Sequence, residues 1–599
     1  MSPPSPLSGP VAVCIDRPIL SLDRPFTYEL PTEVQAGIGS LVRFRFHGKL
    51  TRGWVLGTTD DVPSRMLRIQ TAVSPVQFFD DRMLELLRWV SSRYVAPLAS
   101  VITRSHPPRV ASEDTNVARR DTPLARYGSL EGASPPPPQS LDVYREGDRL
   151  LGAIGHVNGE TYRLRPVPEL EQQTAVEAVG ACLDAGRRAI VIVPEADPLP
   201  ATAEALMGAF GERVAMFVGG DKRARYRMWL DIQAGRYDVV VGTRGVVFAP
   251  VSDLGLIWLS RESHALHREE RSPYFHVRDV ANTRARIDGA VFVMSALCHS
   301  AEAQMLDAVD VVPATRAWPP VEVVKPGPEG RAPRLVAALR EARSGFLFAP
   351  LPGYGVARVC RNCNEPAACA ECGGVLRLEE GRVRCAVCEA EGRCAHCGAS
   401  DFGIARGGAE RVEEWAAALT DSNVRRADRL QPDGITVGGV ETVKDVGAPR
   451  LDLVGILDAD LAARRPGISA MERSLAIWME AAGWARPQGR VIVQSRAAND
   501  PAIQALVQGN PSRYYRAELE RRAKAGFPAG HPVFRVTGTP SLRRELDVTD
   551  PVHVLETSLG DETLCLVTVA PERLEEFGRI VRSLAERGIV TRVEAEPHL

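Results

Sequence analysis

Lysine is scarce in this sequence, and its scarcity excludes one class of nucleotide site. Lysine and arginine together number 73, and only five of these residues are lysines: Lys49, Lys222, Lys325, Lys444 and Lys524. A P-loop needs a Gly-Lys pair followed by Ser or Thr, because the ammonium group must reach the terminal phosphates of the nucleotide. Only Lys49 follows a glycine, and Leu50 comes after it. The sequence therefore contains no P-loop.

Long apolar runs and a strong charge of either sign are also missing. No uninterrupted apolar run approaches the ~18 residues that span a bilayer, and the start MSPPSPLSGP lacks the basic and apolar parts of a secretory signal. We therefore expect a cytoplasmic protein without a membrane partner. Because 73 cationic residues face 75 acidic ones, a uniformly basic nucleic-acid coat protein is excluded. Any DNA site must be a local patch.

The length and the composition indicate several globular domains. The 599 residues are too many for one compact domain, and 45% hydrophobic with 25% charged residues is ordinary for globular proteins. Changes of pattern predict these segments: a compact β-rich domain over 1–107, a flexible Pro-rich linker over 108–150, a first α/β lobe over 151–320, the start of a second lobe over 321–357, a cysteine module over 358–400, the rest of the second lobe over 401–495 and an α+β domain over 496–599.

Both lobes are predicted to contain doubly wound parallel sheets. From about residue 160, short apolar runs alternate with helical stretches, as in a doubly wound α/β fold. The runs of the first lobe lie at 189–195, 213–219, 237–244, 254–260 and 290–296. Further runs at 344–350, 451–458 and 490–495 predict a second such unit, which the cysteine module interrupts. The predicted fold class is therefore multidomain α/β.

Eight of the 12 cysteines fall in one short segment. They form four Cys-x-x-Cys pairs, namely Cys360/Cys363, Cys369/Cys372, Cys385/Cys388 and Cys394/Cys397. In a reducing cytoplasm such pairs indicate zinc rather than disulfides. The other four cysteines stand alone in apolar surroundings, where a cysteine is usually a small buried residue.

The spacing of the pairs predicts two structural zinc ions per chain, each held by four thiolates. The inner pairs suit a hairpin that folds around one ion, and the fold then brings the outer pairs to another. The nested sets are Cys360, Cys363, Cys394 and Cys397 for zinc 1, and Cys369, Cys372, Cys385 and Cys388 for zinc 2. An interleaved cross-brace is the alternative. Because thiolates fill every ligand position, no open site for catalysis is expected.

Two groups of residues are candidates for contact with DNA. A strand-turn-strand pattern over 41–57 carries the best basic patch, formed by Arg43, Arg45, Lys49 and Arg52. A solvated strand face explains these residues equally well. The second candidate is the aromatic pair Tyr274 and Phe275, although such residues are more often part of a core than platforms for base stacking.

Several stretches of the chain resemble the PriA family of replication restart proteins, also called primosomal protein N′. These stretches are DRPFTYELP (23–31), VPE (193–195), VGTRGVVFAP (241–250), YFHVRD (274–279) and ELERRAKAGFP (518–528), together with the eight clustered cysteines. The resemblance covers most of the chain outside 108–165. It implies two superfamily 2 helicase lobes of the RecA-like type, the second interrupted by a double-zinc module with the nested pairing. It also implies an N-terminal domain for DNA 3′ ends at forks, and an aromatic-rich loop at 274–279 that senses DNA.

The nucleotide motifs of that family are replaced in this chain. Its phosphate-binding loop aligns with 166–178, where there is neither glycine nor lysine. The Asp-Glu-x-His segment that holds Mg²⁺ and activates water aligns with 260–263, which is Ser-Arg-Glu-Ser. The last motif supplies arginines that stabilise charge on the transferred phosphoryl group, and 482–487 keeps Arg486 alone. We therefore expect degenerate lobes with no ATPase or helicase activity.

These observations together predict a non-catalytic scaffold for replication restart. We expect it to bind abandoned or stalled forks, with their single-stranded and duplex DNA, and to promote primosome assembly and reloading of the replicative helicase. The partners that the resemblance implies are other primosome and helicase-loading proteins, with single-stranded DNA-binding protein as a further candidate, in a nucleoid-associated cytoplasmic setting. The alternatives are an active ATP-dependent 3′→5′ DNA helicase and a zinc-ribbon adaptor outside replication.

Overall fold

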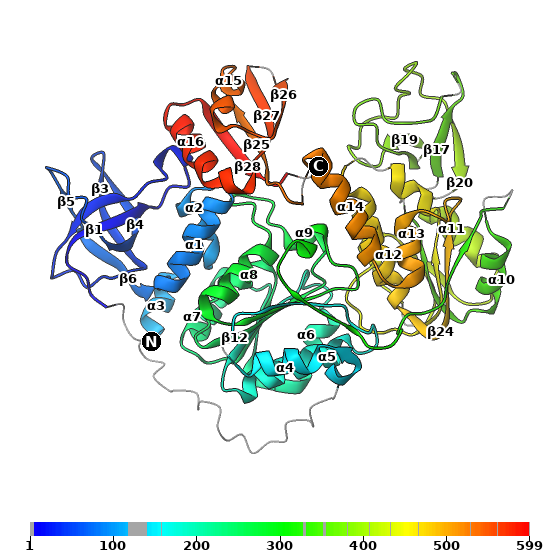
Figure 1. The fold of residues 1–599 in the computed structure, drawn as a ribbon, viewed down its shortest axis with the longest axis horizontal. Coiled ribbons are helices and arrows are strands. Elements are labelled where there is room, and N and C mark those ends of the chain that lie inside the picture. The colour runs from blue at the N-terminus through cyan, green and yellow to red at the C-terminus, as the bar shows by residue number, and fades with distance from the viewer. Residues whose placement is uncertain are drawn as a thin grey trace.

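The structure, a computed structural model, describes residues 5–117, 140–156, 158–327, 331–350, 355–363, 365–379, 381–406, 408–431, 433–464, 467–527, 529–559 and 561–597. Within these ranges the strands form five sheets. Figure 1 shows two central lobes side by side, with the N-terminal sheet in blue at one end and the C-terminal sheet in red above the first lobe. None of the helices in these ranges is both long and apolar enough to cross a bilayer.

The N-terminal domain is a six-stranded, mostly antiparallel sheet followed by helices. Its elements are β1 (Gly9–Ile15), β2 (Phe26–Leu30), β3 (Ser40–Phe46), β4 (Lys49–Thr58), β5 (Leu67–Arg68), β6 (Thr71–Gln77), α1 (Asp81–Arg93), α2 (Leu98–Ser105) and α3 (Ala111–Val117). Along β3, Phe44 and Phe46 are buried while Arg43 and Arg45 are exposed. This alternation is typical of a strand with one face in a core.

The first lobe is an eight-stranded sheet whose main strands are parallel. Its elements are β7 (Tyr144–Arg145), α4 (Gly147–Ile154), β8 (Thr161–Leu164), α5 (Glu171–Asp184), β9 (Arg188–Ile192), α6 (Ala201–Phe210), β10 (Val214–Phe217), α7 (Lys222–Gln233), β11 (Val239–Gly242), β12 (Leu254–Ser260), α8 (Val277–Asp288), β13 (Val291–Ser295), α9 (Ala301–Gln304) and β14 (Val309–Pro313). The strand order is β10-β11-β9-β12-β13-β8-β14-β7. Since β8 and β9 lie on opposite sides of β12 and β13, the carboxyl ends of these strands border the crevice in which such folds bind ligands.

The second lobe is a parallel six-stranded sheet with the order β15-β24-β23-β16-β22-β21. Its elements are β15 (Val321–Val324), α10 (Pro333–Glu341), β16 (Ser344–Phe348), α11 (Ala409–Ala417), β21 (Val424–Arg426), β22 (Gly434–Gly438), β23 (Leu451–Ile456), α12 (Ala470–Gly483) and β24 (Ala485–Gln494). The cysteine module is inserted after β16 as a small sheet of β17 (Gly355–Cys360), β18 (Leu376–Glu379), β19 (Arg382–Cys385) and β20 (Phe402–Arg406).

Helices α13 (Pro501–Gln508) and α14 (Ser512–Ala525) belong to the second lobe. We predicted them as the start of the C-terminal domain, at 496–599. Instead, α13 contacts α12 and β15, and Ile503 and Tyr515 share one core with Trp478. The apolar sides of both helices are therefore buried against the second lobe.

The C-terminal sheet has the order β26-β27-β25-β28. Its elements are β25 (Val533–Gly538), α15 (Leu542–Leu546), β26 (His553–Leu559), β27 (Glu562–Thr568), α16 (Leu574–Glu586) and β28 (Val590–Ala595). With two parallel α/β lobes, a β-rich N-terminal domain, an inserted cysteine module and this α+β unit, the predicted fold class is confirmed.

Both described ends of the predicted flexible linker at 108–150 are ordered. Residues 118–139 lie outside the described residues, but α3 precedes them, and β7 and α4 follow. On α3, the buried Glu113 accepts hydrogen bonds from Arg223 Nε at 2.6 Å and Arg227 Nε at 3.0 Å. The buried Asp114 accepts one from Tyr226 Oη at 2.8 Å. These bonds to α7 fix α3 on the first lobe. The N-terminal domain is therefore attached to that lobe by side-chain contacts.

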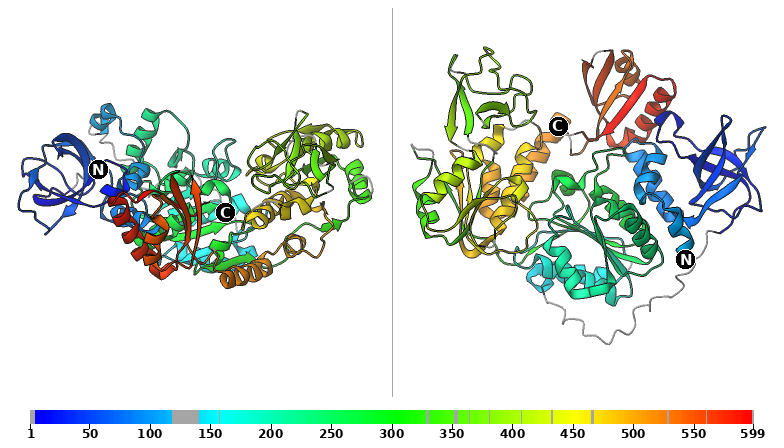
Figure 2. Two further views of the ribbon diagram at one scale, coloured as in Figure 1. Left: turned by 90° about the horizontal axis from the view of Figure 1, so that it is seen from above. Right: turned by 180° about the vertical axis from the view of Figure 1, so that it is seen from behind.

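The N-terminal helices, the first lobe and the C-terminal sheet share one hydrophobic core. Figure 2 shows them from above and from behind as one continuous body. Ion pairs reinforce the contact, with Arg582 Nε 2.7 Å from Asp23 Oδ2, and Arg93 Nη2 2.5 Å from Glu596 Oε1. The two ends of the chain therefore hold each other in place.

Replacing Glu113 tests the attachment of α3. We expect Glu113→Gln to lower the unfolding free energy by about 1–3 kcal/mol, because a buried carboxylate loses charge-assisted hydrogen bonds to two arginines. Thermal unfolding and limited proteolysis within 108–150 measure the effect. Glu85→Gln, an exposed position on α1, is the control. Identical melting and cleavage of the two variants would contradict a role for Glu113 in holding α3.

Candidate functional site

The crevice between the lobes carries carboxylates where the resemblance places nucleotide phosphates. The loop after β8 leads into α5, which begins at Glu171. The Glu171 side chain accepts a hydrogen bond from Ser295 Oγ at 3.2 Å. Burial, together with the negative charges of Glu480 and Asp445, raises the pKa of Glu171 to about 8, although Arg261 opposes the shift. The N-terminus of a helix ordinarily attracts an anion, and here a carboxyl group of the chain itself occupies that position.

Arg261 joins the two lobes in this crevice. It directly follows β12, has a left-handed backbone with φ of 51°, and is 4% exposed. Its guanidinium donates a hydrogen bond to the carbonyl oxygen of Val443 at 3.0 Å and lies 3.4 Å from Glu480 Oε2. Both of these residues belong to the second lobe. On the first lobe, Glu195 Oε1 lies 3.8 Å from the same guanidinium.

Asp445 forms a second connection between the lobes. Its carboxylate accepts hydrogen bonds from the backbone N–H of Thr202 at 3.2 Å and from Thr202 Oγ1 at 2.8 Å. Its carbonyl oxygen also accepts one from Ala201 N at 3.1 Å. Asp445 thus caps α6 of the first lobe from the second lobe, as an acidic residue stabilises the free N–H groups of a helix start.

Glu262, the acidic residue nearest to the replaced Mg²⁺ and base positions, lies outside the crevice. It is fully buried and accepts hydrogen bonds from Arg278 Nη1 at 3.0 Å, Ser300 N at 2.8 Å and Ser300 Oγ at 2.6 Å. Burial is the largest influence and raises its pKa, but the Arg278 guanidinium, His299, His276 and the Ser300 hydrogen bond together outweigh burial, so the net pKa is lowered. Arg486, the remaining arginine of the last motif, forms an ion pair with Asp452 at 2.9 Å. Neither residue is free to act on a nucleotide in this arrangement.

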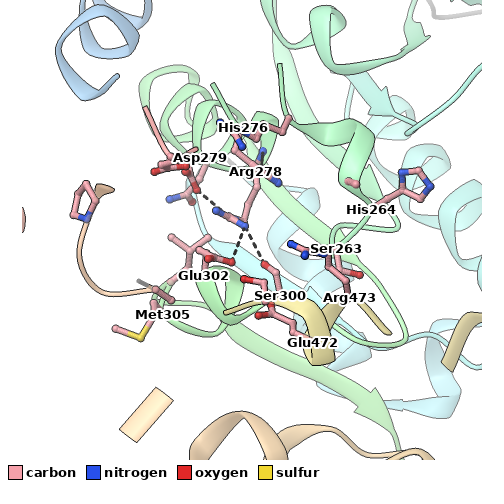
Figure 3. Close-up of a pocket in the computed structure, with 18 of the residues that line it drawn as sticks. Ser263, His264, His276, Arg278, Asp279, Ser300, Glu302, Met305, Glu472 and Arg473 are labelled. Atoms are coloured by element: carbon pink, nitrogen blue, oxygen red, sulfur yellow. Dashed lines mark hydrogen bonds and ion pairs between the residues drawn. The ribbon is translucent and has the colours of Figure 1, made fainter. Parts of the chain in front are cut away.

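A cavity of about 800 Å³ lies beside this network, where the first lobe, the second lobe and the C-terminal unit meet. Figure 3 shows Arg278 on its wall between Asp279, Glu302 and Ser300, and Glu472 on the wall nearby. Glu472 accepts a hydrogen bond from Ala301 N at 2.7 Å and forms an ion pair with Arg522 at 2.8 Å. Buried charges around the cavity are therefore compensated within each lobe, and the bond from Ala301 N to Glu472 links the two lobes.

The eight clustered cysteines come together as two sets of four. One set is Cys360, Cys363, Cys394 and Cys397, and the other is Cys369, Cys372, Cys385 and Cys388, with all Sγ atoms of a set within 4.8 Å of one another. Within the sets, neighbouring Sγ atoms lie 3.5–3.7 Å apart. A tetrahedral ion with bonds of about 2.3 Å needs separations of about 3.8 Å. The structure therefore has the nested arrangement, and both sets could hold a metal ion.

The predicted basic patch is divided by the register of the hairpin. Residues directly opposite each other in an antiparallel pair point to the same side of the sheet. Arg43 lies opposite Arg52, but Lys49 lies opposite the buried Phe46. Lys49 therefore belongs to the other face, which corrects the prediction of a single patch. Arg52 forms an ion pair with Asp16 at 3.2 Å, whereas Arg43 and Arg45 remain exposed.

The aromatic candidates Tyr274 and Phe275 are part of the core. Tyr274 is 8% exposed and Phe275 is 2% exposed. The Phe275 ring makes an edge contact with Phe248, and the Tyr274 hydroxyl accepts a hydrogen bond from Arg592 Nη2 at 3.1 Å. In this arrangement neither ring is accessible for stacking on a base, because both side chains are packed against the first lobe.

The sequence did not reveal which carboxylates surround Arg261. Glu171 fell within the replaced phosphate loop, but Glu480 and Asp445 are separated from it by about half of the chain. No spacing rule links them, since they meet only when the lobes close. The aspartate cap that Asp445 gives to α6 likewise comes from a distant segment.

Comparisons with known proteins agree on one family. A family model described as "3'DNA-binding domain (3'BD)" of PriA matches residues 12–107. The chain is 30% identical to "Probable replication restart protein PriA" of Mycobacterium tuberculosis (strain H37Rv), over 94% of this chain and 92% of that protein. It is 26% identical to "Replication restart protein PriA" of Treponema pallidum, over 91% and 90%. The protein of the same name from Bacillus subtilis is 23% identical, over 65% and 55%.

The carboxylates of the crevice predict a specific dependence on pH. A carboxyl whose pKa rises from about 4.5 to about 8 on folding keeps its proton in the folded state while the unfolded chain loses it. The unfolding free energy therefore falls as the pH rises from about 4.5 to about 8, and is constant above that range. Because Gln cannot ionise, the unfolding free energy of the Glu171→Gln variant should fall less steeply over this pH range.

Thermal unfolding between pH 5 and pH 9 measures this difference. The exposed Glu204→Gln on α6 is the control, and it should follow the wild-type curve. Parallel curves for wild type and Glu171→Gln would show that Glu171 is already ionised at neutral pH in the folded protein.

Proposed function

The chain belongs to the PriA family of replication restart proteins, and we propose that it serves replication restart as a non-catalytic scaffold on forked DNA. The observation that carries this proposal is the crevice between the lobes. There Arg261 and the carboxyl groups of Glu171, Glu195, Asp445 and Glu480 lie where the resemblance to the family places the nucleotide and its Mg²⁺.

Electrostatics oppose the binding of ATP in this crevice. Two like charges about 4 Å apart repel by roughly 4 kcal/mol at an effective dielectric constant of 20. Burial and the charges of Glu480 and Asp445 already raise the pKa of Glu171 to about 8, so its carboxyl group keeps a proton at neutral pH. A triphosphate would bring further negative charge to a crevice that already suppresses the ionisation of its own carboxyl group. Arg261 already has carboxylate neighbours on both lobes, and the loop 166–178 contains no lysine to compensate.

An active ATP-dependent helicase is the weaker interpretation. It would need a residue to hold Mg²⁺ and a base to activate water, at positions where Ser260 and Arg261 stand. Ser260 is fully buried, and Glu262 is engaged by Arg278 and Ser300. A helicase also alternates between open and closed lobes, whereas here side chains of the chain, Arg261 and Asp445, connect the two lobes. A zinc-ribbon adaptor outside replication is disfavoured by the family.

DNA binding is assigned first to the N-terminal domain, over residues 12–107. Arg43 and Arg45 are the exposed cations of its β3 strand, and such guanidinium groups follow a phosphate backbone without distinguishing bases. Because this domain shares a core with the first lobe and the C-terminal sheet, a DNA arm bound there has a fixed direction relative to both. Fork selectivity then comes from rigid placement rather than from a flexible linker.

We assign two zinc ions to the two cysteine sets, because thiolates at these separations fit tetrahedral Zn²⁺. All four positions are thiolate, so the ions would stabilise the module and take no part in a reaction. The module stands beyond the second lobe (Figure 1), where it can meet proteins at the fork. Its proposed partners are primosome and helicase-loading proteins, with single-stranded DNA-binding protein as a further candidate, at the nucleoid in the cytoplasm.

Fork binding without ATP turnover is the central test. Fluorescence anisotropy of forked DNA should give the same affinity with and without ATP, and phosphate release on forked DNA should match a protein-free blank. Arg43→Ala/Arg45→Ala should weaken binding and reduce the slope of log affinity against log salt by roughly 1.4–1.8, for two lost phosphate contacts. DNA-stimulated turnover that Arg486→Ala abolishes would show an active helicase, and absence of fork binding would refute the scaffold.

Metal content tests the cysteine module. Purified protein should carry about two equivalents of zinc, one for each set of four thiolates. Cys369→Ser should lose one ion and unfold the module, because metal binding supplies much of the folding free energy of such small units. Cys182→Ala, a buried cysteine outside the module, should keep both ions. One equivalent in the wild type, or all eight thiols reacting freely in the native protein, would disprove two sites.

A further inference from the structure

Helix α14 exposes a row of cations that neither the lobes nor the C-terminal sheet uses. Arg513, Arg516, Arg521 and Lys524, which we name the α14 strip, are all exposed. Arg521 forms an ion pair with Glu518 on its own helix. For Arg513, Arg516 and Lys524, no carboxylate of the described residues lies within ion-pair distance. The only acidic residue on the exposed side is Glu520.

The opposite side of α14 is firmly anchored. Tyr514, Tyr515, Glu518 and Arg522 are buried there. Arg522 Nε lies 2.7 Å from Glu518 Oε1, and Arg522 Nη2 lies 2.8 Å from Glu472 Oε2 on α12. Glu472 also accepts the hydrogen bond from Ala301 of the first lobe. The α14 strip is therefore held on a rigid support that is continuous with both lobes.

More cations gather at the corner where α14 begins. Arg165 Nη1 donates a hydrogen bond to Asn510 Oδ1 at 2.8 Å, and Arg316 Nη2 donates one to the carbonyl oxygen of Val507 at 3.2 Å. Both guanidinium groups donate to neutral oxygens of this corner, at the start of α14. The basic surface thus extends from this corner along α14.

We propose that the α14 strip binds the phosphate backbone of a second arm of forked DNA. This proposal rests on the proposed function of the chain as a fork scaffold. Arg513 and Lys524 are 11 positions apart, so the strip is about 16 Å long at 1.5 Å per residue. That length corresponds to roughly five phosphates of one duplex strand, at about 3.4 Å each along the axis. Side chains at helical spacing can therefore follow one strand.

The composition of the strip fits DNA better than a protein surface. Protein interfaces are usually centred on buried aromatic or large apolar side chains, and the other exposed residues between Arg513 and Lys524 are Ala517, Glu520 and Ala523. Charge alone suffices for phosphates. In both Figure 1 and the view from above in Figure 2, α14 and the N-terminal sheet lie on opposite sides of the C-terminal sheet. Two DNA arms could thus be held at once.

A triple substitution with a matched control tests the α14 strip in the full-length protein. Arg513→Gln/Arg516→Gln/Lys524→Gln removes three cations while keeping residues that favour a helix. The control, Arg340→Gln/Arg343→Gln/Arg425→Gln, removes three exposed cations from α10, the turn after it and β21. The strand β21 is the edge of the second sheet opposite to β15, on which α13 packs. Both proteins are titrated with labelled forked DNA and with linear duplex at several salt concentrations.

We expect the strip variant to reduce the salt slope on forked DNA by roughly 2–3, corresponding to three lost phosphate contacts, while the control keeps the wild-type slope. The preference for forked over linear DNA should fall with it. As a second variant, Glu520→Gln should tighten fork binding, because it removes the exposed carboxylate that lies on α14 among the cations of the strip. This gain cannot result from misfolding.

The outcomes separate this inference from the proposed function. A wild type that binds no fork overturns both. A wild type that binds the fork, with unchanged slopes in the strip variant and unchanged affinity in Glu520→Gln, overturns the second DNA contact alone. In that case the α14 strip faces an acidic protein or solvent.

Discussion

The guanidinium of Arg261 lies between the two lobes, and the arrangement of the whole molecule depends on that contact. It binds the Val443 carbonyl and approaches Glu480 on the second lobe, while Glu195 approaches it from the first. In a nucleotide-driven protein of this architecture, the phosphates and the metal ion are the charges that draw the lobes together. Here an arginine and carboxyl groups of the chain make the contacts between the lobes.

Burying so many charges is tolerated only because they are mutually compensated. An isolated buried carboxylate is strongly destabilising unless it is paired or protonated, and both solutions occur here. Glu262 is ionised between Arg278 and Ser300, whereas Glu171 has its pKa raised to about 8 and keeps its proton at neutral pH. The crevice therefore has little capacity for further negative charge, which supports the proposal of a scaffold that does not turn over ATP.

The same logic of buried, compensated charge fixes the outer units. Glu113 and Asp114 attach α3 to α7, and Arg582 with Asp23 joins the two ends of the chain. The N-terminal domain, the first lobe and the C-terminal sheet consequently form one body. Arg261 connects this body to the second lobe through Val443 and Glu480. Rigid placement of separate basic surfaces suits the recognition of a branched DNA better than flexible attachment would, since less conformational entropy is lost on binding.

The sequence by itself determined the features that depend on local order along the chain. Apolar runs at strand length predicted the parallel sheets, the repeated Cys-x-x-Cys pairs predicted two sets of four thiolates, and the absence of a Gly-Lys pair before Ser or Thr excluded a P-loop. Only the tertiary structure decided what depends on distant partners. Glu480 and Asp445 reach Arg261 because the lobes close. Pairing with Phe46 turned Lys49 to the other face, and packing on the first lobe buried Tyr274 and Phe275. The periodicity of a segment limits which secondary structure it can form, but contacts between segments far apart in the chain decide which groups each residue contacts.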